Sequence, residues 1–185
     1  MCIRDRVQRA TATFRWTGSW HTVFVTVDRR GGQPMDNPLR DSLRQFLERF
    51  RMAGHDVEVE GPTYVPMELG LTVCVAPNHR ASQVRQAILD VLSNRDLPDG
   101  RRGLFHPDNL TFGQVVFLSP LVAAVRGLDG VASVQVDTFQ RQSVPSTAGI
   151  AAGKLTFERL EIPRLDNDPD FPDRGLLRLN LRGGL

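Results

Sequence analysis

The sequence predicts an α+β fold in which a mixed or antiparallel sheet is covered mainly on one face by helices. In several short segments apolar and polar residues alternate, as in half-buried strands, whereas other segments carry apolar residues at helical spacing. These segments follow one another as strand, helix, strand, strand, helix, strand, helix, strand. That order favours a ferredoxin-like (split βαβ) core, followed by a C-terminal β-ribbon.

Residues 22–54 contain one predicted strand and one predicted helix. Residues 22–28 alternate valine with other side chains, which is the period-2 pattern of a strand. Asn37 and Pro38 predict a helix start, since an Asn side chain can cap the first turn and proline at N1 loses no bonded donor. Gly54 is predicted to end this helix. Its expected buried residues are Leu39, Leu43, Phe46, Leu47 and Phe50.

The next segments predict two strands and a second helix. Residues 57–59 and 67–75 both alternate, and because they are joined closely we expect them to pair antiparallel. A helix is predicted to begin at Asn78 or Ser82 and to end near Asn94. Its apolar positions are Val84, Ile88, Val91 and Leu92.

The second half predicts shorter elements joined by longer loops. Ser119 and Pro120 predict the start of a short helix that ends near Gly127. Proline, glycine and aspartate predict an exposed loop at 97–109. The remaining predicted elements are strands at 113–118 and 133–137 and a final ribbon of 160–162 with 177–181, whose strands flank an acidic turn at 166–170.

Four parts are predicted along the chain. The first six residues resemble a translated sequencing-adapter tail, so we expect them to lie outside the natural protein. The predicted parts are an artefactual or partial N-terminal segment at 1–19, an α+β core at 20–141, a linker or long loop at 142–153 and a C-terminal β-ribbon at 154–185.

Composition limits the possible classes of protein. The 185 residues are 41% hydrophobic and 24% charged, as in ordinary globular domains. No apolar run approaches the roughly 20 residues that span a bilayer, so we expect a cytoplasmic protein without a membrane partner. Cys2 and Cys74 predict no disulfide framework.

The charges argue against a nucleic-acid partner. The 23 basic and 21 acidic residues are interleaved, whereas a nucleic-acid binder usually gathers its basic residues. Phe14, Trp16 and Trp20 could stack on bases, but the clearest strands present valine and glutamate. We expect these aromatic residues to pack on an adjacent domain or a partner. A nucleic-acid-binding module remains an alternative.

The acidic turn is the most site-like segment for a metal. Asp166, Asp168 and Asp170 have the alternate spacing of calcium ligands, but Phe171 replaces the turn glycine and Leu177 replaces the bidentate glutamate. The sequence therefore predicts a hairpin connection here, and neither a metal nor a cofactor.

Two histidines stand beside carboxylates. His106 with Asp108, and His55 with Asp56, could each pair for acid–base chemistry. Catalysis would also need a nucleophile, and Ser119 does not lie in the motif of an exposed nucleophile. Cys74 does not either. We predict no catalytic residue, with a hydrolase-like enzyme that uses His106 and Asp108 as the alternative.

Five segments together resemble the C-terminal region of baseplate assembly proteins. These proteins form the baseplate J-like group of contractile phage tails and phage-tail-like injection systems, and the resemblance covers the chain from about Trp20 onward. The segments, in chain order, are 26–32 (TVDRRGG), 50–54 (FRMAG), 56–66 (DVEVEGPTYVP), 97–108 (LPDGRRGLFHPD) and 165–172 (LDNDPDFP).

The resemblance implies a structural wedge subunit without catalytic residues. Its implied partners are other wedge, hub and sheath-proximal proteins in a multi-subunit ring, with assembly in the cytoplasm into a phage or phage-tail-like particle. Arginine and aromatic side chains in loops favour protein contacts. The predicted contact residues are Arg29, Arg30, Arg101, Arg102, Phe105, Asp166, Asp168 and Phe171.

Overall fold

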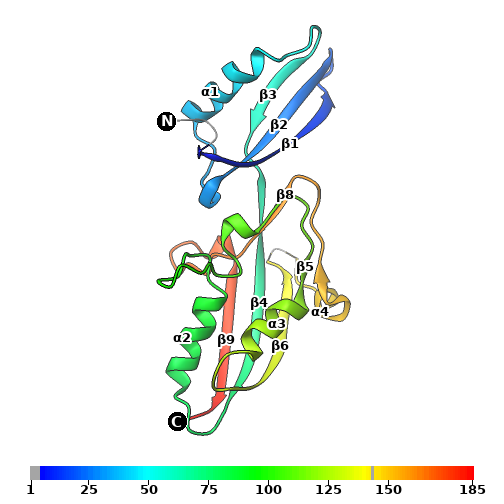
Figure 1. Cartoon of the computed structure of the whole chain (residues 1–185). Helices are drawn as coiled ribbons and strands as arrows, with labels where there is room; N and C mark the ends of the chain where they lie inside the picture. Colours follow the sequence, from blue (N-terminus) through cyan, green and yellow to red (C-terminus); the bar gives the residue numbers. More distant parts are fainter. Residues whose placement is uncertain (1–4, 143) are drawn as a thin grey trace. The chain divides into compact units, whose positions relative to one another are not determined.

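A computed structural model describes residues 5–142 and 144–185. Its mixed sheets and helices confirm the predicted α+β class (Figure 1). The chain forms two compact units, which are described separately below. Unit 1 comprises Met1–Thr63 and Arg159–Glu161, and unit 2 comprises Tyr64–Glu158 and Ile162–Leu185.

Unit 1 is a three-stranded sheet that carries one helix. Strands β1 (Val7–Trp16), β2 (His21–Arg29) and β3 (Asp56–Glu60) lie in the order β1-β2-β3. The pair β1–β2 is antiparallel, and β2–β3 is parallel because helix α1 (Asn37–Glu48) makes the crossover between them. The apolar side chains of α1 and of the two parallel strands face each other. This core contains Val27, Leu39, Leu43 and Val59.

Asp36 caps α1, and not the predicted Asn37. The Leu39 backbone N–H donates to Asp36 Oδ1 at 2.8 Å, while Arg29 Nη1 lies 2.7 Å from Asp36 Oδ2. The helix ends at Glu48, well before Gly54. Phe50 therefore lies beyond the helix and is 69% exposed, so its predicted burial is wrong. Phe46 is also exposed.

Unit 2 is built around β4 (Thr63–Val75). It pairs antiparallel with β6 (Val131–Arg141) on one side and parallel with β9 (Leu176–Gly183) on the other. Strand β8 (Glu161–Arg164) also pairs with β4. The other elements are α2 (Ala81–Val91), α3 (Leu118–Arg126), α4 (Ala148–Ala152) and the two-stranded sheet β5 (Val116–Phe117) with β7 (Lys154–Leu155).

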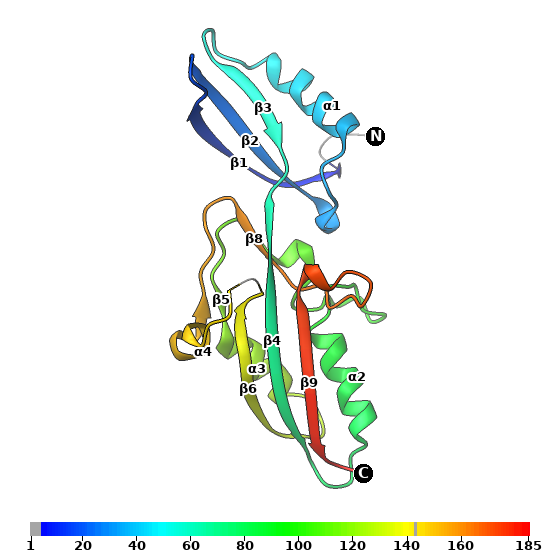
Figure 2. The ribbon, with the colours of Figure 1, turned by 180° about the vertical axis from the view of Figure 1, so that it is seen from behind.

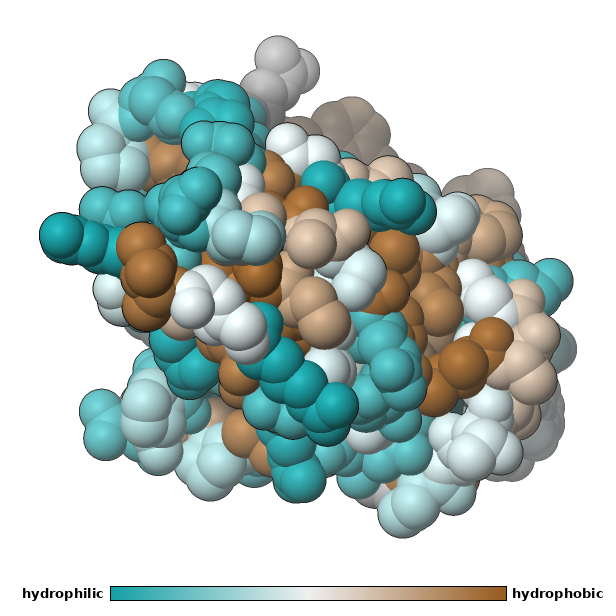
Figure 3. All heavy atoms as spheres, turned by 90° about the horizontal axis from the view of Figure 1, so that it is seen from below, coloured by the Kyte–Doolittle hydropathy of each residue, from teal (hydrophilic) through white to brown (hydrophobic). Residues whose placement is uncertain are grey.

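Helices α2 and α3 cover one face of the sheet of unit 2 (Figures 1 and 2). This arrangement follows from the apolar faces of the two helices. Val84 and Ile88 of α2, with Leu121 and Val125 of α3, are buried against the alternating apolar residues of β4. From the end where the C-terminus lies, hydrophobic side chains remain visible between hydrophilic ones (Figure 3).

The predicted single ferredoxin-like sheet does not form. Strands β3 and β4, which were expected to pair with each other, belong to different sheets. Pro62, between them, cannot donate to a strand ladder. Residues 67–73 are all buried, which requires a central position for β4 with neighbours on both sides.

The predicted C-terminal ribbon is also wrong. In the described part of the chain, β8 and β9 each pair with β4, and no pairing joins them to each other. The loop between them is closed at its base, where the Asp166 N–H donates to the Arg174 carbonyl at 3.0 Å. Leu177, Leu179 and Leu181 of β9 pack against the main core.

The unit boundaries differ from the predicted parts. Strand β1 falls within the predicted N-terminal segment at 1–19 but pairs along its length with β2. The predicted linker at 142–153 contains α4. Residues 1–4, with Cys2, and residue 143 lie outside the described residues. Among the described residues, no helix has both the length and the apolarity needed to span a membrane.

The Asp36 cap predicts a pH-dependent contribution to stability. The Leu39 N–H, and then Arg29, lower the pKa of Asp36 below its usual value. The contribution is therefore complete above about pH 4 and is lost as the pH falls through the lower folded-state pKa. Asp36→Ala should lower the melting temperature at pH 7, and Asp36→Ser should restore most of it.

Thermal unfolding monitored by circular dichroism between pH 7 and pH 2.5 tests this prediction. The difference between wild type and Asp36→Ala should shrink at the acidic end. A difference that stays constant over this range would contradict the role of the ionised carboxylate.

Candidate protein-interaction surfaces

The loop at 93–109 of unit 2 folds back on itself. Gly103 makes this possible, because a Cβ at this position would lie 2.1 Å from the Ser93 carbonyl oxygen. The Gly103 N–H donates to the Arg95 carbonyl at 3.0 Å, and the Leu97 N–H donates to the Arg101 carbonyl at 2.7 Å. The loop is therefore a closed, hydrogen-bonded turn and not a freely moving segment.

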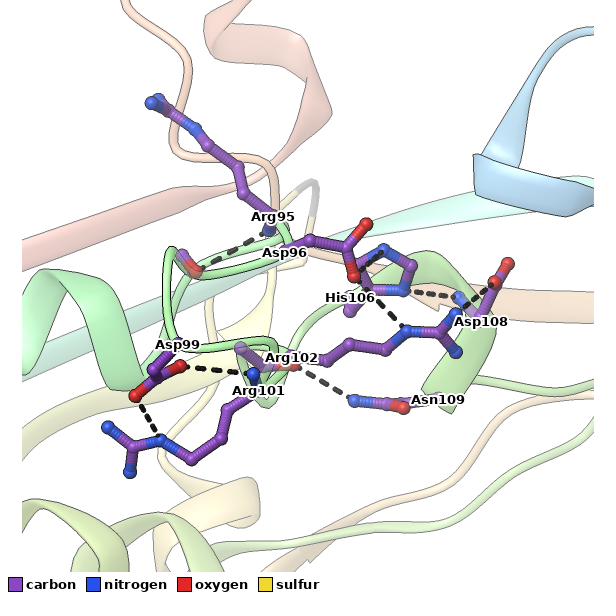
Figure 4. A network of polar contacts seen from close by, with 10 residues as sticks. Arg95, Asp96, Asp99, Arg101, Arg102, His106, Asp108 and Asn109 are labelled. Atoms are coloured by element: carbon purple, nitrogen blue, oxygen red, sulfur yellow. Dashed lines mark hydrogen bonds and ion pairs between the residues drawn. The ribbon is translucent and has the colours of Figure 1, made fainter.

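Asp99 and Arg101 form the tip of this loop (Figure 4). Asp99 accepts hydrogen bonds from the Arg101 N–H at 3.0 Å and from Arg101 Nε at 2.6 Å. The backbone bond, followed by the guanidinium, lowers the pKa of Asp99. The Arg101 side chain is 73% exposed, so its guanidinium is held in place while its outer surface stays open to a partner.

Arg102 braces the loop from within. Its Nε lies 3.2 Å from Asp96 Oδ1, and its Nη2 lies 3.3 Å from Asp108 Oδ2 (Figure 4). Asp96 and Arg102 also form an isolated backbone bridge. Arg102 therefore joins the two ends of the loop, and it differs from Arg101 in being part of the loop's own structure.

His106 is a structural side chain in this loop. Its side chain is 8% exposed, and its Nδ1 accepts a hydrogen bond from the Asp108 N–H at 3.1 Å. The proton of the neutral ring then resides on Nε2, which lies 3.6 Å from Asp96 Oδ1. The Asp108 carboxylate faces Arg102. These contacts account for the positions of the His106 and Asp108 side chains.

Phe105 lies in the hydrophobic core of unit 2 and is only 3% exposed. It was predicted as a contact residue, and this burial contradicts the prediction. The ring anchors the loop to the core, so a partner could reach it only after local unfolding. The Gly/Pro-rich composition of the segment predicts an exposed loop, but tertiary packing buries the Phe105 ring.

The acidic turn uses its carboxylates internally. Asp166 forms an ion pair with Arg164 and has a side chain that is 9% exposed. Asp168 Oδ1 accepts the Asp170 N–H at 3.0 Å. Within the described ranges, no group of three candidate ligands gathers to hold a metal ion. Phe171 is 44% exposed, and its ring stacks with Arg174.

The two loops of unit 2 meet at one groove, although about seventy residues separate them in the sequence. The groove has a volume of about 510 Å³. Its walls are the end of α2, the start of the 93–109 loop and the acidic turn. Its polar lining includes Gln86, Asp90, Asn94, Arg95, Asp96, Asp166 and Asn167.

The predicted contact residues of unit 1 differ from each other in exposure. The side chain of Arg29 is 16% exposed, because its guanidinium binds Asp36 and the Pro34 carbonyl. Arg30 is exposed. Only Arg30 of this pair is open to a partner, and Arg29 instead fixes the start of α1.

The sequence analysis missed part of an apolar surface on unit 1. It singled out Phe14, Trp16 and Trp20, which are 65%, 61% and 52% exposed. It assigned Phe46 and Phe50 to the core and did not consider Met52. A hollow of about 190 Å³ lies beside Phe50 and Met52. It is lined by Val23, Val25, Leu47, Phe50, Arg51, Met52, His55 and Val57.

Comparison with known proteins gives a family match for the first part of the chain. Residues 4–60, which correspond to unit 1, match the family model described as the baseplate J-like central domain. The predicted resemblance to baseplate J-like proteins is confirmed. The match includes β1, which precedes the region where the sequence resemblance was expected to begin.

A solved structure is also similar to this chain. It is a chain in the cryo-EM structure of the 6-fold symmetrised anti-feeding prophage (AFP) baseplate, with 14% identity and a TM-score of 0.46. The match covers 82% of this chain and 31% of that chain. This chain therefore spans about a third of the length of that protein. No curated protein matches it.

The close approach at Gly103 predicts a large effect of one methyl group. Gly103→Ala should lower the free energy of unfolding by about 1–3 kcal/mol, since the backbone must move away from Ser93. Gly127→Ala is the control, because Gly127 has a helical φ of −75° and should accept alanine with little change. Urea unfolding would measure both variants, and equal stabilities would contradict the folded loop.

Proposed function

We propose that this protein is a wedge component of the baseplate of a contractile phage tail or a phage-tail-like injection particle. The observation that carries the proposal is the match of residues 4–60 to the baseplate J-like central domain. In this proposal the protein acts through contacts with neighbouring proteins, and its loops and exposed apolar surface are the contact regions.

The 93–109 loop is suited to such contacts. Arginine and aromatic residues dominate the energetics of many interfaces, and they contribute most when their position is fixed before binding. Arg101 meets both conditions, because Asp99 holds it while its side chain is 73% exposed. Arg30 and Phe171 are the other exposed members of the predicted contact set.

The proposed partners are other wedge, hub and sheath-proximal proteins in a ring. A ring requires heterologous contacts, in which two different surfaces of neighbouring subunits meet. Two compact units with different surfaces satisfy this requirement. Unit 2 contributes polar, arginine-bearing loops, and unit 1 contributes an apolar face.

A charge reversal at the loop tip tests this proposal. Arg101→Glu should reduce incorporation of the protein into assembled particles while the melting temperature stays nearly unchanged, since an exposed ion pair contributes little to stability. Arg80→Glu is the matched control, because Arg80 is also exposed and lies outside the loop. Arg102→Glu should lower stability as well, since Arg102 braces the loop.

The measurement is the amount of tagged protein in purified particles after complementation of a strain that lacks the gene. Normal incorporation of Arg101→Glu would contradict the role of the loop. Loss of incorporation of the Arg80→Glu control to the same degree would also contradict it.

A further inference from the structure

Helix α1 covers only part of the sheet of unit 1. It lies nearer to β3 than to β1, as two opposite views agree (Figures 1 and 2). On the β3 side, Arg44 of α1 lies 3.1 Å from Glu58, and Arg51, which follows the helix, lies 3.6 Å from Asp56. Ion pairs therefore join this side of the helix and the segment after it to β3.

The other flank of α1 is aromatic and open. The 100° rotation per residue places Phe46 away from Arg44 and on the side that faces β1. Phe46 and Phe50 are 40% and 69% exposed and contact each other, with ring centroids 5.3 Å apart. The guanidinium of Arg49 lies 4.8 Å from the centre of the Phe46 ring.

Strand β1 presents an apolar stripe to the same side of the sheet. In the register with β2, Ala12 pairs with Val25 and Phe14 with Val23, so these residues share the face that α1 covers elsewhere. Along β1, this face is exposed. The stripe consists of Ala10, Ala12, Phe14 and Trp16.

The aromatic pair, the stripe and the hollow are joined by contacts, and we call them together the unit 1 trough. Phe50 lines the hollow, and Phe14 of the stripe contacts His55, which also lines it, with ring centroids 5.8 Å apart. The floor of the trough contains Val23 and Val25 of β2. Its two sides are the Phe46–Phe50 pair, at and just beyond the C-terminal end of α1, and the stripe on β1. The hollow of about 190 Å³ is smaller than a typical small-molecule pocket of about 300–1,000 Å³, which favours side chains of a protein partner.

We propose that the unit 1 trough binds an amphipathic α-helix of a partner protein, whose apolar stripe is flanked by carboxylates. Such a helix would lie beside α1 on the uncovered part of the sheet. Neighbouring helices pack about 8–10 Å apart, and small residues at Ala10 and Ala12 allow a helix to approach the sheet closely.

A helix fits the trough better than an added strand. Strand addition needs the free backbone groups along the outer edge of β1. The Ala12 carbonyl, in the middle of that edge, already accepts a hydrogen bond from Arg159 Nη2 at 3.1 Å. Charged side chains at an edge are a common device that prevents strand pairing.

The charges of the trough favour an acidic partner. Arg51 is the only side chain with a permanent charge among those that line the hollow. Arg49 lies over Phe46 on the open flank, and among the described residues no carboxylate forms an ion pair with it. Carboxylates beside the apolar stripe of the partner would meet the Arg49 guanidinium, whereas Arg51 already pairs with Glu48 and Asp56.

A second copy of this chain is a poor source for the helix. The longer helices of the chain already bury their apolar faces in its own cores, through Leu39 and Leu43 in α1, and through Ile88 in α2 and Val125 in α3. The inference rests on the proposed function, because it names the kind of partner that unit 1 would contact in a baseplate.

Tryptophan fluorescence of the full chain provides the test. Trp16 and Trp20 are the only tryptophans of the protein and both lie in unit 1, so the burial of Trp16 should shift the emission to shorter wavelength. The probe is a synthetic helical peptide of roughly 18 residues, or five turns, with leucine and phenylalanine on one face and glutamate on both flanks. The comparison peptides carry lysine on the flanks or a scrambled order.

The glutamate-flanked peptide should bind saturably, and about three- to tenfold more tightly than the lysine-flanked peptide at low salt. Ala12→Glu should abolish binding, because it places a carboxylate in the exposed stripe. Arg49→Glu should reverse the peptide preference. Arg80→Glu is the control and should bind like wild type.

Several results would overturn the inference. These are equal binding of the scrambled peptide, binding of an extended strand-forming peptide alone, or dimerisation of the chain that Ala12→Glu abolishes. Failure of all peptides to bind would also overturn it. Because the Arg101→Glu incorporation assay concerns unit 2, that assay can succeed while this one fails, and the two failures are therefore distinguishable.

Discussion

Burial of β4 is the constraint on which unit 2 depends. Nine of the thirteen residues of this strand are buried, including the polar residues Glu68 and Thr72. Glu68 accepts a hydrogen bond from Gln140 at 2.7 Å and forms an ion pair with Arg178 at 3.0 Å. Thr72 donates to Asp137 at 2.6 Å. These bonds hold β6 and β9 to β4 on its polar face, because a buried polar group without a partner is costly.

Because these bonds hold the sheet of unit 2 together, few further contacts are enough to order the loops attached to it. The 93–109 loop is closed by backbone bonds and by one arginine, Arg102, which joins Asp96 and Asp108. Phe105 fixes it to the core beneath. The entropy of ordering the loop is lost when the chain folds and not when a partner binds. In the proposed function, the exposed tip is thereby prepared for contact with a partner.

Local patterns were predicted well where one side of an element meets the core. The alternation in β2 and the presence of a short helix at α3 were both read from the sequence, although α3 begins at Leu118 and Ser119 is not its cap. The pairing partners of the strands could not be predicted from the sequence, since pairing depends on segments far apart in the chain. The exposure of Phe46 was missed because helical spacing shows which residues share a side of a helix but not how much of that side the sheet covers. Arg101 and Arg102 are adjacent arginines, so the sequence does not distinguish them. Only the tertiary contacts show that Arg101 is exposed at the loop tip and that Arg102 braces the loop.

The central claim is that this protein works through two prepared contact surfaces, the loop tip of unit 2 and the trough of unit 1. Hydrogen–deuterium exchange of the chain, free and within purified baseplates, tests it most directly. The account predicts that assembly slows exchange in the 95–102 segment and in β1, while the already protected core of β4 changes little. Unchanged exchange in both surfaces, together with new protection elsewhere, would contradict it.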